Sequence, residues 1–423
     1  MIRLPDFSGA RRALGPGPFR IYTVGNVTSL IGTWMQRISV GYLTWEMTHS
    51  ATWLGLMAFA DLFPTVIIGP FAGVAADRWS RQQVLRITQF LGLVQALSLA
   101  VLHMMGLLSV GLLLVITLAL GIIAAFAQPS RLALISSMVP RELVASAVAV
   151  NAISFNLARF LGPAVAGVLI STFSVSAAFA VNALTYAVFI WALARLPDLP
   201  TGRSKAPGSF WADLFSGFGY IRRERAAAEV LLAMAVSGIA ARPVIELMPG
   251  FAGQVFDRGA AGLAALTSAI GIGAMLGGAW MAARPPGSPL ARPMVLAGLI
   301  SALGVVAFAC AFNFFLALVV IALVGGCWVV AGITAQTLLQ LGVASEVRGR
   351  VLAIYGLILK ASPALGALAT GSLADVLGLR FSVAGAAILA SLYMAYLLLR
   401  VRQRFAGLEP EPQPDQARTG TRR

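Results

Sequence analysis

The sequence predicts an all-α membrane protein with twelve transmembrane helices in two bundles of six. Of its 423 residues, 59% are hydrophobic and only 11% are charged, and the mean hydropathy is +0.86. A soluble domain is about 45–50% apolar and about 25% charged. One core cannot hold this excess, because the buried fraction grows slowly with chain length. The surplus must therefore face lipid, which excludes a soluble enzyme, a disordered protein and a disulfide-stapled secreted domain.

Apolar runs between charged or glycine- and proline-rich breaks mark twelve spans, since a helix needs about 20 apolar residues to cross a bilayer. They are residues 19–45, 53–75, 84–104, 107–126, 143–170, 176–193, 230–251, 263–283, 294–311, 314–336, 351–373 and 379–399. The spans and the breaks predict five regions. These are a cytoplasmic N-terminal segment at 1–18, bundles at 19–194 and 230–400, a cytoplasmic linker at 195–229 and a disordered cytoplasmic tail at 401–423.

The distribution of positive charge predicts the orientation of the chain. The net charge is +15, and most of the 31 basic residues fall on one side of the expected spans, whereas the other side holds Arg258 and Arg380. Because lysine and arginine accumulate in cytoplasmic loops, we expect both termini in the cytoplasm. The positive charge therefore predicts the membrane topology and contact with membrane lipids. It does not indicate a nucleic-acid site.

The sequence offers little for a metal centre, a cofactor or a phosphate-binding loop. Cys310 and Cys327 both lie in apolar runs, and His49 and His103 have no ligand partners near them in sequence. We therefore expect no metal and no cofactor. The chain has two lysines, Lys205 and Lys360, and neither follows the Gly-x-x-x-x-Gly-Lys-Ser/Thr spacing that an ATP-driven pump would need.

Six ionisable side chains lie well within the expected spans and mark a substrate or proton pathway. Each costs about 2.5–3.5 kcal/mol at a helix centre, so such residues usually face a cavity or a partner. They are Arg37, Asp61, Arg159, Arg242, Glu246 and Lys360. Arg37 and Asp61 lie about 12 Å deep from the same side, at about 1.5 Å per residue, which predicts an ion pair. Arg242 and Glu246 are four residues apart and would share one helix face.

These charges allow two interpretations. Either the pairs only neutralise each other, or Asp61 or Glu246 carries a proton, because low dielectric favours the neutral acid and a nearby arginine favours the ionised one. The surplus of two cations among the six favours an anionic or neutral amphiphile as substrate. A polar stripe on the first span adds Asn26 and Thr33 to the candidates, and it either lines a cavity or bonds to neighbouring helices.

A weak internal repeat relates the two halves. Residues 150–159 and 351–360 share Val, Ala and Ile, end in a cation and precede a proline. Both lie in the fifth span of their half. Two six-helix halves with a substrate site between them at mid-membrane are typical of transporters.

Between the second and third spans lies Gly73-Val-Ala-Ala-Asp77-Arg78-Trp-Ser-Arg81-Gln82. It resembles the signature loop Gly-x-x-x-Asp-Arg-x-Gly-Arg-Lys/Arg of the major facilitator superfamily, with serine in place of the loop glycine and glutamine in place of the last basic residue. The stretches 32–37, 156–163 and 346–350 extend the resemblance to the drug and siderophore exporter branch, which includes the enterobactin exporter and macrolide efflux proteins.

The resemblance implies the major facilitator fold and a function. It implies a monomeric secondary transporter, not an enzyme, in the bacterial plasma (inner) membrane. This transporter would export a small drug-like or siderophore-like amphipathic compound by alternating access, and the export would be coupled to protons. A lipid or lysolipid flippase, a solute importer of the same fold and a non-transporting membrane sensor remain as alternatives.

The resemblance also implies a gate at the signature loop. Its residues would be Gly73, Asp77, Arg78 and Arg81, with bend points at Gly162 and Pro163. Asp77 would meet a basic side chain or the positive end of a helix near the membrane surface. Two simpler readings are a turn whose arginines bind lipid phosphates and, at Gly162 and Pro163, plain packing kinks.

Overall fold

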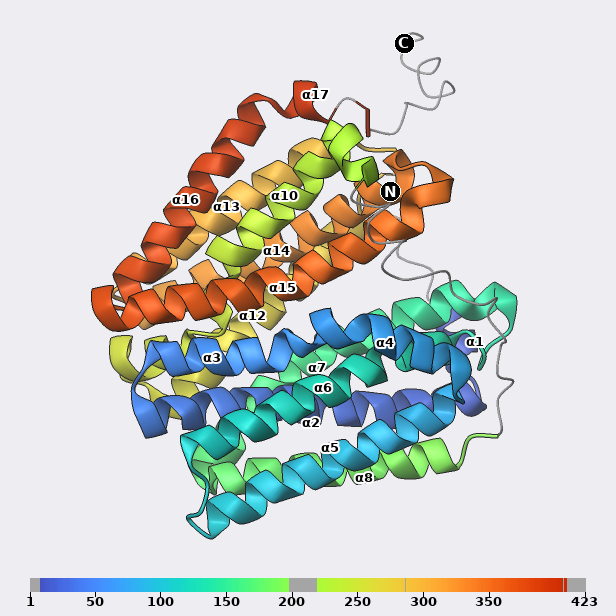
Figure 1. Cartoon of the computed structure of the whole chain (residues 1–423), viewed down its shortest axis with the longest axis vertical. Coiled ribbons are helices and arrows are strands. Elements are labelled where there is room, and N and C mark those ends of the chain that lie inside the picture. Colours follow the sequence, from blue (N-terminus) through green and yellow to red (C-terminus); the bar gives the residue numbers. More distant parts are fainter. Residues whose placement is uncertain (1–7, 198–218, 286, 406, 409–423) are drawn as a thin grey trace. The chain divides into compact units, whose positions relative to one another are not determined.

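The computed structural model describes residues 8–197, 219–285, 287–405 and 407–408, with the side chains of residues 8, 70 and 73–78 outside the description (Figure 1). The described residues contain helices and no strand. The chain forms two compact units. Unit 1 is Met1–Pro207 with Ile245–Gly271, and unit 2 is Gly208–Val244 with Ile272–Arg423. The boundary between the units therefore crosses two helical segments, one near residue 245 and one near residue 271.

Unit 1 contains most of the N-terminal helices. They are α1 (Ser8–Ala13), α2 (Pro18–Thr48), α3 (Ala51–Leu62), α4 (Pro64–Arg78), α5 (Arg81–Met104), α6 (Val110–Ile135), the short helix η1 (Arg141–Leu143), α7 (Val144–Thr172) and α8 (Val175–Ala194). From the later chain it takes α11 (Met248–Gly250), the π-helix η3 (Phe251–Val255) and the first part of α12 (Gly259–Ala282).

Unit 2 contains the remaining helices and the rest of α12. They are α10 (Arg225–Ala240), most of the 3₁₀ helix η2 (Arg242–Ile245), α13 (Ala291–Cys310), α14 (Phe314–Gly342), α15 (Ser345–Leu377), α16 (Leu379–Leu399) and α17 (Val401–Arg404). Helix α13 packs against α14 and α16, and α10 packs against α15. Small residues allow such close approach, because a Cβ on Gly366 of α15 would lie 2.7 Å from the Cα atom of Ile239 in α10.

The predicted spans coincide with helical segments. In the described part of the chain, 11 helical segments are long and apolar enough to cross a membrane, and they match the second to twelfth predicted spans. The first predicted span is α2, which has 31 residues but is not among the 11. Its polar side chains Asn26 and Gln36 are 1% and 0% exposed, so they are shielded within unit 1. Helix α2 can therefore also cross the membrane, which brings the number of spans to twelve.

Two predicted spans are interrupted, and prolines explain both breaks. The second span is divided into α3 and α4 just before Pro64, which lacks the N–H that a helix interior requires. The seventh span is divided into α10, η2, α11 and η3, with Pro243 and Pro249 inside the irregular region. This second break decides the geometry of the candidate site.

A buried hydrogen-bond network holds α2 inside unit 1. The Gln36 amide donates to Gln95 of α5 at 2.8 Å and accepts from Asn182 of α8 at 2.6 Å. Ser29 donates to Gln89 of α5 at 2.9 Å. Ser29 of the predicted polar stripe thus bonds to a neighbouring helix, one of the two roles predicted for the stripe.

The C-terminal end of unit 2 differs from the predicted tail at 401–423. Residues 401–404 form α17, and Phe405 and Leu408 are 1% and 2% exposed in the apolar core of the unit. Arg404 also forms an ion pair with Glu229 of α10, 2.5 Å between Nη1 and Oε1. These buried apolar groups and this ion pair hold the segment, whereas residues 406 and 409–423 lie outside the described part.

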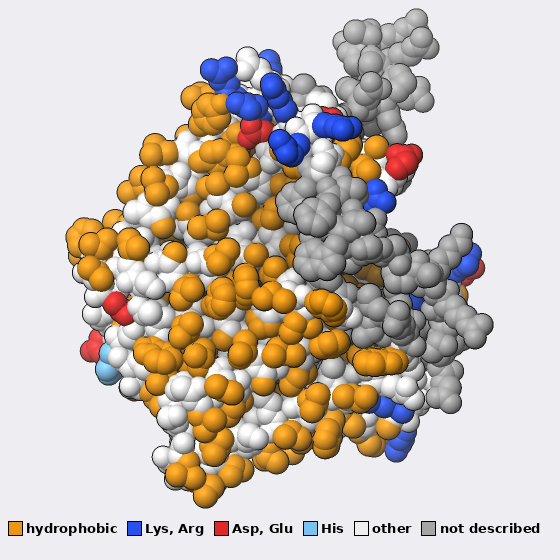
Figure 2. Space-filling model, viewed as in Figure 1, with side chains coloured by type: hydrophobic (Ala, Val, Ile, Leu, Met, Phe, Trp, Pro, Cys, Tyr) orange, Lys and Arg blue, Asp and Glu red, His pale blue; other side chains and the backbone are white. Residues whose placement is uncertain are grey.

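Apolar side chains cover most of the face shown in Figure 2, with lysine and arginine at its margins. Large hydrophobic residues are exposed along the helices, for example Leu184 at 66%, Val376 at 83% and Leu399 at 86%. Such exposure on a water-soluble protein would mark an interaction patch. Repeated along the spans of both units, it indicates helices that face lipid.

Candidate functional site

Three ionisable side chains, Arg37, Asp61 and Glu246, meet in unit 1. The Arg37 guanidinium of α2 donates from Nη2 to Glu246 Oε1 at 2.6 Å. Its Nε lies 3.6 Å from Oδ2 of Asp61, near the end of α3. The side chains of Arg37, Asp61 and Glu246 are 27%, 25% and 14% exposed, so the group, which we call the Arg37 cluster, is partly buried. The ion pair predicted between Arg37 and Asp61 is therefore present.

The prediction that Arg242 and Glu246 share one helix face is wrong. Helix α10 ends at Ala240, and the chain continues as a 3₁₀ helix over Arg242–Ile245 that contains Pro243. The i, i+4 spacing brings side chains together only in a continuous α-helix. Glu246, directly after this break, pairs with Arg37, 209 residues earlier in the chain.

Trp34 provides an aromatic platform beside the Arg37 cluster. The Cζ atoms of Arg37 and Arg159 lie 5.5 and 5.6 Å from the centre of the Trp34 ring, within the range of cation–π attraction. Phe155 packs edge-on against the same ring, 5.7 Å between the ring centres. Sequence analysis missed this role, although Trp34 stands three residues before Arg37 and so lies on the same face of α2.

Trp34, Arg37 and Glu246 line a hollow of unit 1, about 500 Å³ including space open to solvent. Its charged lining is Arg37, Arg159 and Glu246, and its apolar lining comes from α2, α7, α12 and the segment around α11. Together with Asp61, which pairs with Arg37, these side chains carry formal charges that sum to zero. A hollow with one aromatic platform, fixed charges and apolar walls is typical of a small-molecule site.

The predicted bend points lie next to this hollow. Pro163 is part of its lining. A Cβ on Gly162 would lie 2.5 Å from Trp34 Cβ and 3.0 Å from both the Ile31 carbonyl oxygen and the Met35 nitrogen. Gly162 therefore allows α7 to pack closely on α2, directly behind the Trp34 platform.

The other predicted pathway residues lie elsewhere. Asn26 donates to Asn151 of α7 at 3.3 Å, and Thr33 donates to the Ser29 carbonyl one turn earlier at 2.8 Å. Neither lines the hollow of unit 1. Lys360 lies on α15 of unit 2 and is exposed.

The predicted gate is only partly described. Gly73, Asp77 and Arg78 lie at the end of α4, and their side chains are outside the described residues. Arg81, the first residue of α5, donates to the Ala133 carbonyl of α6 at 3.3 Å. Arg81 thus ties the ends of two helices together, and the gating role of the loop stays a prediction.

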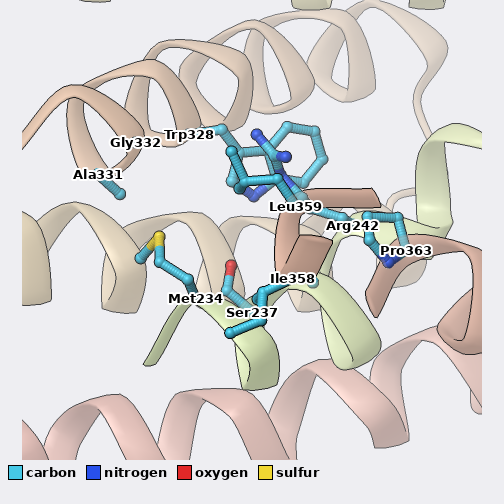
Figure 3. Close-up of a pocket in the computed structure, with 10 residues that line it drawn as sticks. Met234, Ser237, Arg242, Trp328, Ala331, Gly332, Ile358, Leu359 and Pro363 are labelled. Atoms are coloured by element: carbon cyan, nitrogen blue, oxygen red, sulfur yellow. The ribbon is translucent and has the colours of Figure 1, made fainter. Parts of the chain in front are cut away.

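A second, smaller hollow lies in unit 2, about 330 Å³ including space open to solvent. Figure 3 shows the guanidinium group of Arg242 against the indole ring of Trp328. The Cζ atom of Arg242 lies 5.7 Å from the ring centre. Arg37, Arg159, Asp61 and Glu246 of unit 1 thus carry no net charge. The two surplus cations predicted from sequence, Arg242 and Lys360, belong to unit 2.

Comparison with known proteins gives a family match over almost the whole chain. Residues 12–415 match the family model described as transmembrane secretion effector, of the major facilitator type. The macrolide efflux protein A of Streptococcus pyogenes is 21% identical over 91% of this chain and 97% of its own. The enterobactin exporter of Shigella flexneri is 25% identical over 84% of each chain.

Other similarities are more local or concern the fold alone. The staphyloferrin A transporter of Staphylococcus aureus is 27% identical over 40% of this chain, and the match spans only 42% of that relative. The structure of a bacterial homologue of the human lysosomal transporter Spinster covers 96% of this chain with a TM-score of 0.73 at 14% identity. A peptide transporter structure covers 92% with a TM-score of 0.73 at 12% identity.

Proposed function

We propose, from the premise that this chain belongs to the transmembrane secretion effectors of the major facilitator superfamily, that it exports a small amphipathic compound in exchange for protons by alternating access. The chain is a multi-pass membrane transporter and not an enzyme. Relatives named for siderophore and macrolide export support the direction and the kind of cargo. The predicted charge asymmetry supports an inner-membrane protein with cytoplasmic termini, and we propose a monomer as the working unit.

The single observation that carries proton coupling is the Arg37 cluster. One guanidinium holds two carboxylates, one at 2.6 Å and one at 3.6 Å, beside the hollow of unit 1. A carboxylate in a poorly solvated site stays ionised only while a cation compensates it. Any movement that draws Glu246 away from Arg37 therefore favours binding of a proton, and the return of Arg37 favours its release.

The position of Glu246 in the chain suits such a role. The residue stands between η2 and α11, in the broken part of the seventh span, and not within a rigid helix. Discontinuous helices are typical of the ion and substrate sites of transporters. Arg37 and the Trp34 platform line the same hollow, so proton exchange and the occupancy of that hollow act on one set of side chains.

The experiment is coupled transport in liposomes. Purified protein is reconstituted, a pH gradient is imposed, and movement of a labelled macrolide or labelled enterobactin is followed. We expect Glu246→Gln to abolish the dependence of transport on the gradient, because the amide cannot exchange the proton. Glu229→Gln is the matched control, since Glu229 also pairs with an arginine but lies outside the hollow.

Two outcomes would contradict the proposal. If Asp61→Asn and Glu246→Gln both leave gradient-driven transport unchanged, the Arg37 cluster does not couple protons. Movement of the labelled compound only into vesicles whose interior corresponds to the cytoplasm would replace export by import.

A further inference from the structure

We propose that the hollow of unit 2 is a subsite for a carboxylate carried on an apolar body, with Arg242 as the anion-binding residue and Trp328 as the second donor. As part of a transport route the subsite rests on the proposed function. Binding of the anion itself does not, because the contacts that define it lie within one compact unit.

Among the described residues, Arg242 has no compensating anion. In the described residues no hydrogen bond or ion pair involves its guanidinium, and its observed contact is with the ring of Trp328. The nearby Tyr355 hydroxyl already donates to the Gly332 carbonyl at 3.0 Å. None of the described residues that line the hollow is Asp or Glu. A partly buried arginine with five N–H donors and no acceptor is costly, so the site favours a ligand that supplies one.

A second donor in the same hollow also lacks an acceptor. Trp328 is 3% exposed, and its Nε1–H is buried without a hydrogen-bond partner in the described part of the chain. A buried donor left unpaired costs about 1–3 kcal/mol. Trp328 and Arg242 line the same hollow, so a ligand with two acceptor oxygens could satisfy groups of both residues.

The remaining walls define the rest of the ligand. Met234, Ile358, Leu359 and Pro363 provide apolar surface, and Ser237 is the one hydroxyl among the described lining residues (Figure 3). Cationic compounds would meet Arg242 without an acid to offset it. The apolar lining and the arginine therefore favour a carboxylic acid with an apolar body and oppose an amine of the same shape.

The experiment is equilibrium dialysis of radiolabelled benzoate against the purified full-length protein, with benzylamine and acetate as unlabelled competitors. We expect saturable benzoate binding with one site per chain, competition by acetate only at higher concentration because it lacks the ring, and no competition by benzylamine. Arg242→Gln should weaken benzoate binding by about tenfold to a hundredfold, the worth of a hydrogen bond to a charged group.

Three further variants separate the subsite from general damage. Trp328→Phe keeps an aromatic ring, although a smaller one, and removes the N–H, and it should weaken binding by about threefold to tenfold. Arg242→Lys keeps the charge and should retain more binding than Arg242→Gln. Arg284→Gln is the matched control, since Arg284 also stacks on a tryptophan of unit 2, with Cζ 5.0 Å from the Trp280 ring, but lies outside the hollow. It should bind benzoate like the parent.

The subsite would be overturned by equal benzoate binding in the parent and in Arg242→Gln, by the absence of saturable binding to the parent, or by benzylamine competing as well as benzoate. If Arg242→Gln does not fold, loss of binding in Trp328→Phe with retention in Arg284→Gln decides the matter, and unchanged binding in Trp328→Phe overturns the proposal. Benzoate binding without transport in liposomes would refute export alone, whereas transport without benzoate binding would refute the subsite alone.

Discussion

Replacing Gly162 by alanine tests whether the close approach of α7 to α2 positions the Trp34 platform. The new Cβ would lie 2.5 Å from Trp34 Cβ, whereas ordinary contacts begin near 3.4 Å, so the helices must separate locally by about 0.9 Å. Two of the three nearest atoms belong to the backbone of α2, at 3.0 Å, and cannot move aside like a flexible side chain. Overpacking of this kind costs about 1–3 kcal/mol.

Gly356→Ala provides the matched control for this substitution. Gly356 is an exposed residue of α15, and a Cβ there would meet nothing within 4 Å. Alanine favours a helix over glycine by about 1 kcal/mol, a gain that both variants share. The two variants should therefore differ in stability by about 1–3 kcal/mol, with Gly162→Ala the less stable.

The assay is thermal unfolding of the purified variants in detergent, followed by transport in liposomes. We expect a lower midpoint for Gly162→Ala than for Gly356→Ala, together with weaker transport because Trp34 is displaced. Equal midpoints with normal transport would refute the packing argument. Equal midpoints with transport lost only in Gly162→Ala would instead favour a bend point that must move during gating.

Two further substitutions test the packing of each unit. Gln36→Leu should lower the stability of unit 1 by about 1–3 kcal/mol, because it leaves buried groups of Gln95 and Asn182 unpaired; a thermal midpoint equal to that of the parent would contradict this. Phe405→Ala should destabilise unit 2 by about 3–5 kcal/mol, since Phe405 is 1% exposed. Phe312→Ala, at a site 92% exposed, is its control, and equal midpoints for these two would contradict burial of the C-terminal segment.

Sequence reasoning located the helices because lipid imposes a length and an apolar composition on each span. It also found the Arg37–Asp61 pair, since depth in the membrane follows from the number of residues to the helix end. It could not find the pairing of Glu246, because depth says nothing about rotation around a helix axis. The break at Pro243 changes that rotation, so the assumption of a continuous helix assigned Glu246 the wrong neighbour.

The same limit applies to Trp34 and Trp328. Both are apolar residues within spans, and composition cannot distinguish a tryptophan that packs in a core from one that supports a guanidinium. Only the fold shows that Arg37 and Arg159 share the first ring and that Arg242 stacks on the second. The buried and unpaired N–H of Trp328 is likewise a property of packing, which no sequence pattern encodes.

The charges within the spans serve the two units differently. In unit 1, Arg37 and Arg159 are balanced by Asp61 and Glu246, so protonation of one acid changes a neutral group into a cationic one. In unit 2, none of the described residues that line the hollow beside Arg242 is an acid, so under our proposal a ligand anion would compensate its charge. If both proposals hold, proton exchange and anion binding would depend on separate side chains. Coupling between them would then come from the movement that alternating access requires, and not from a shared residue.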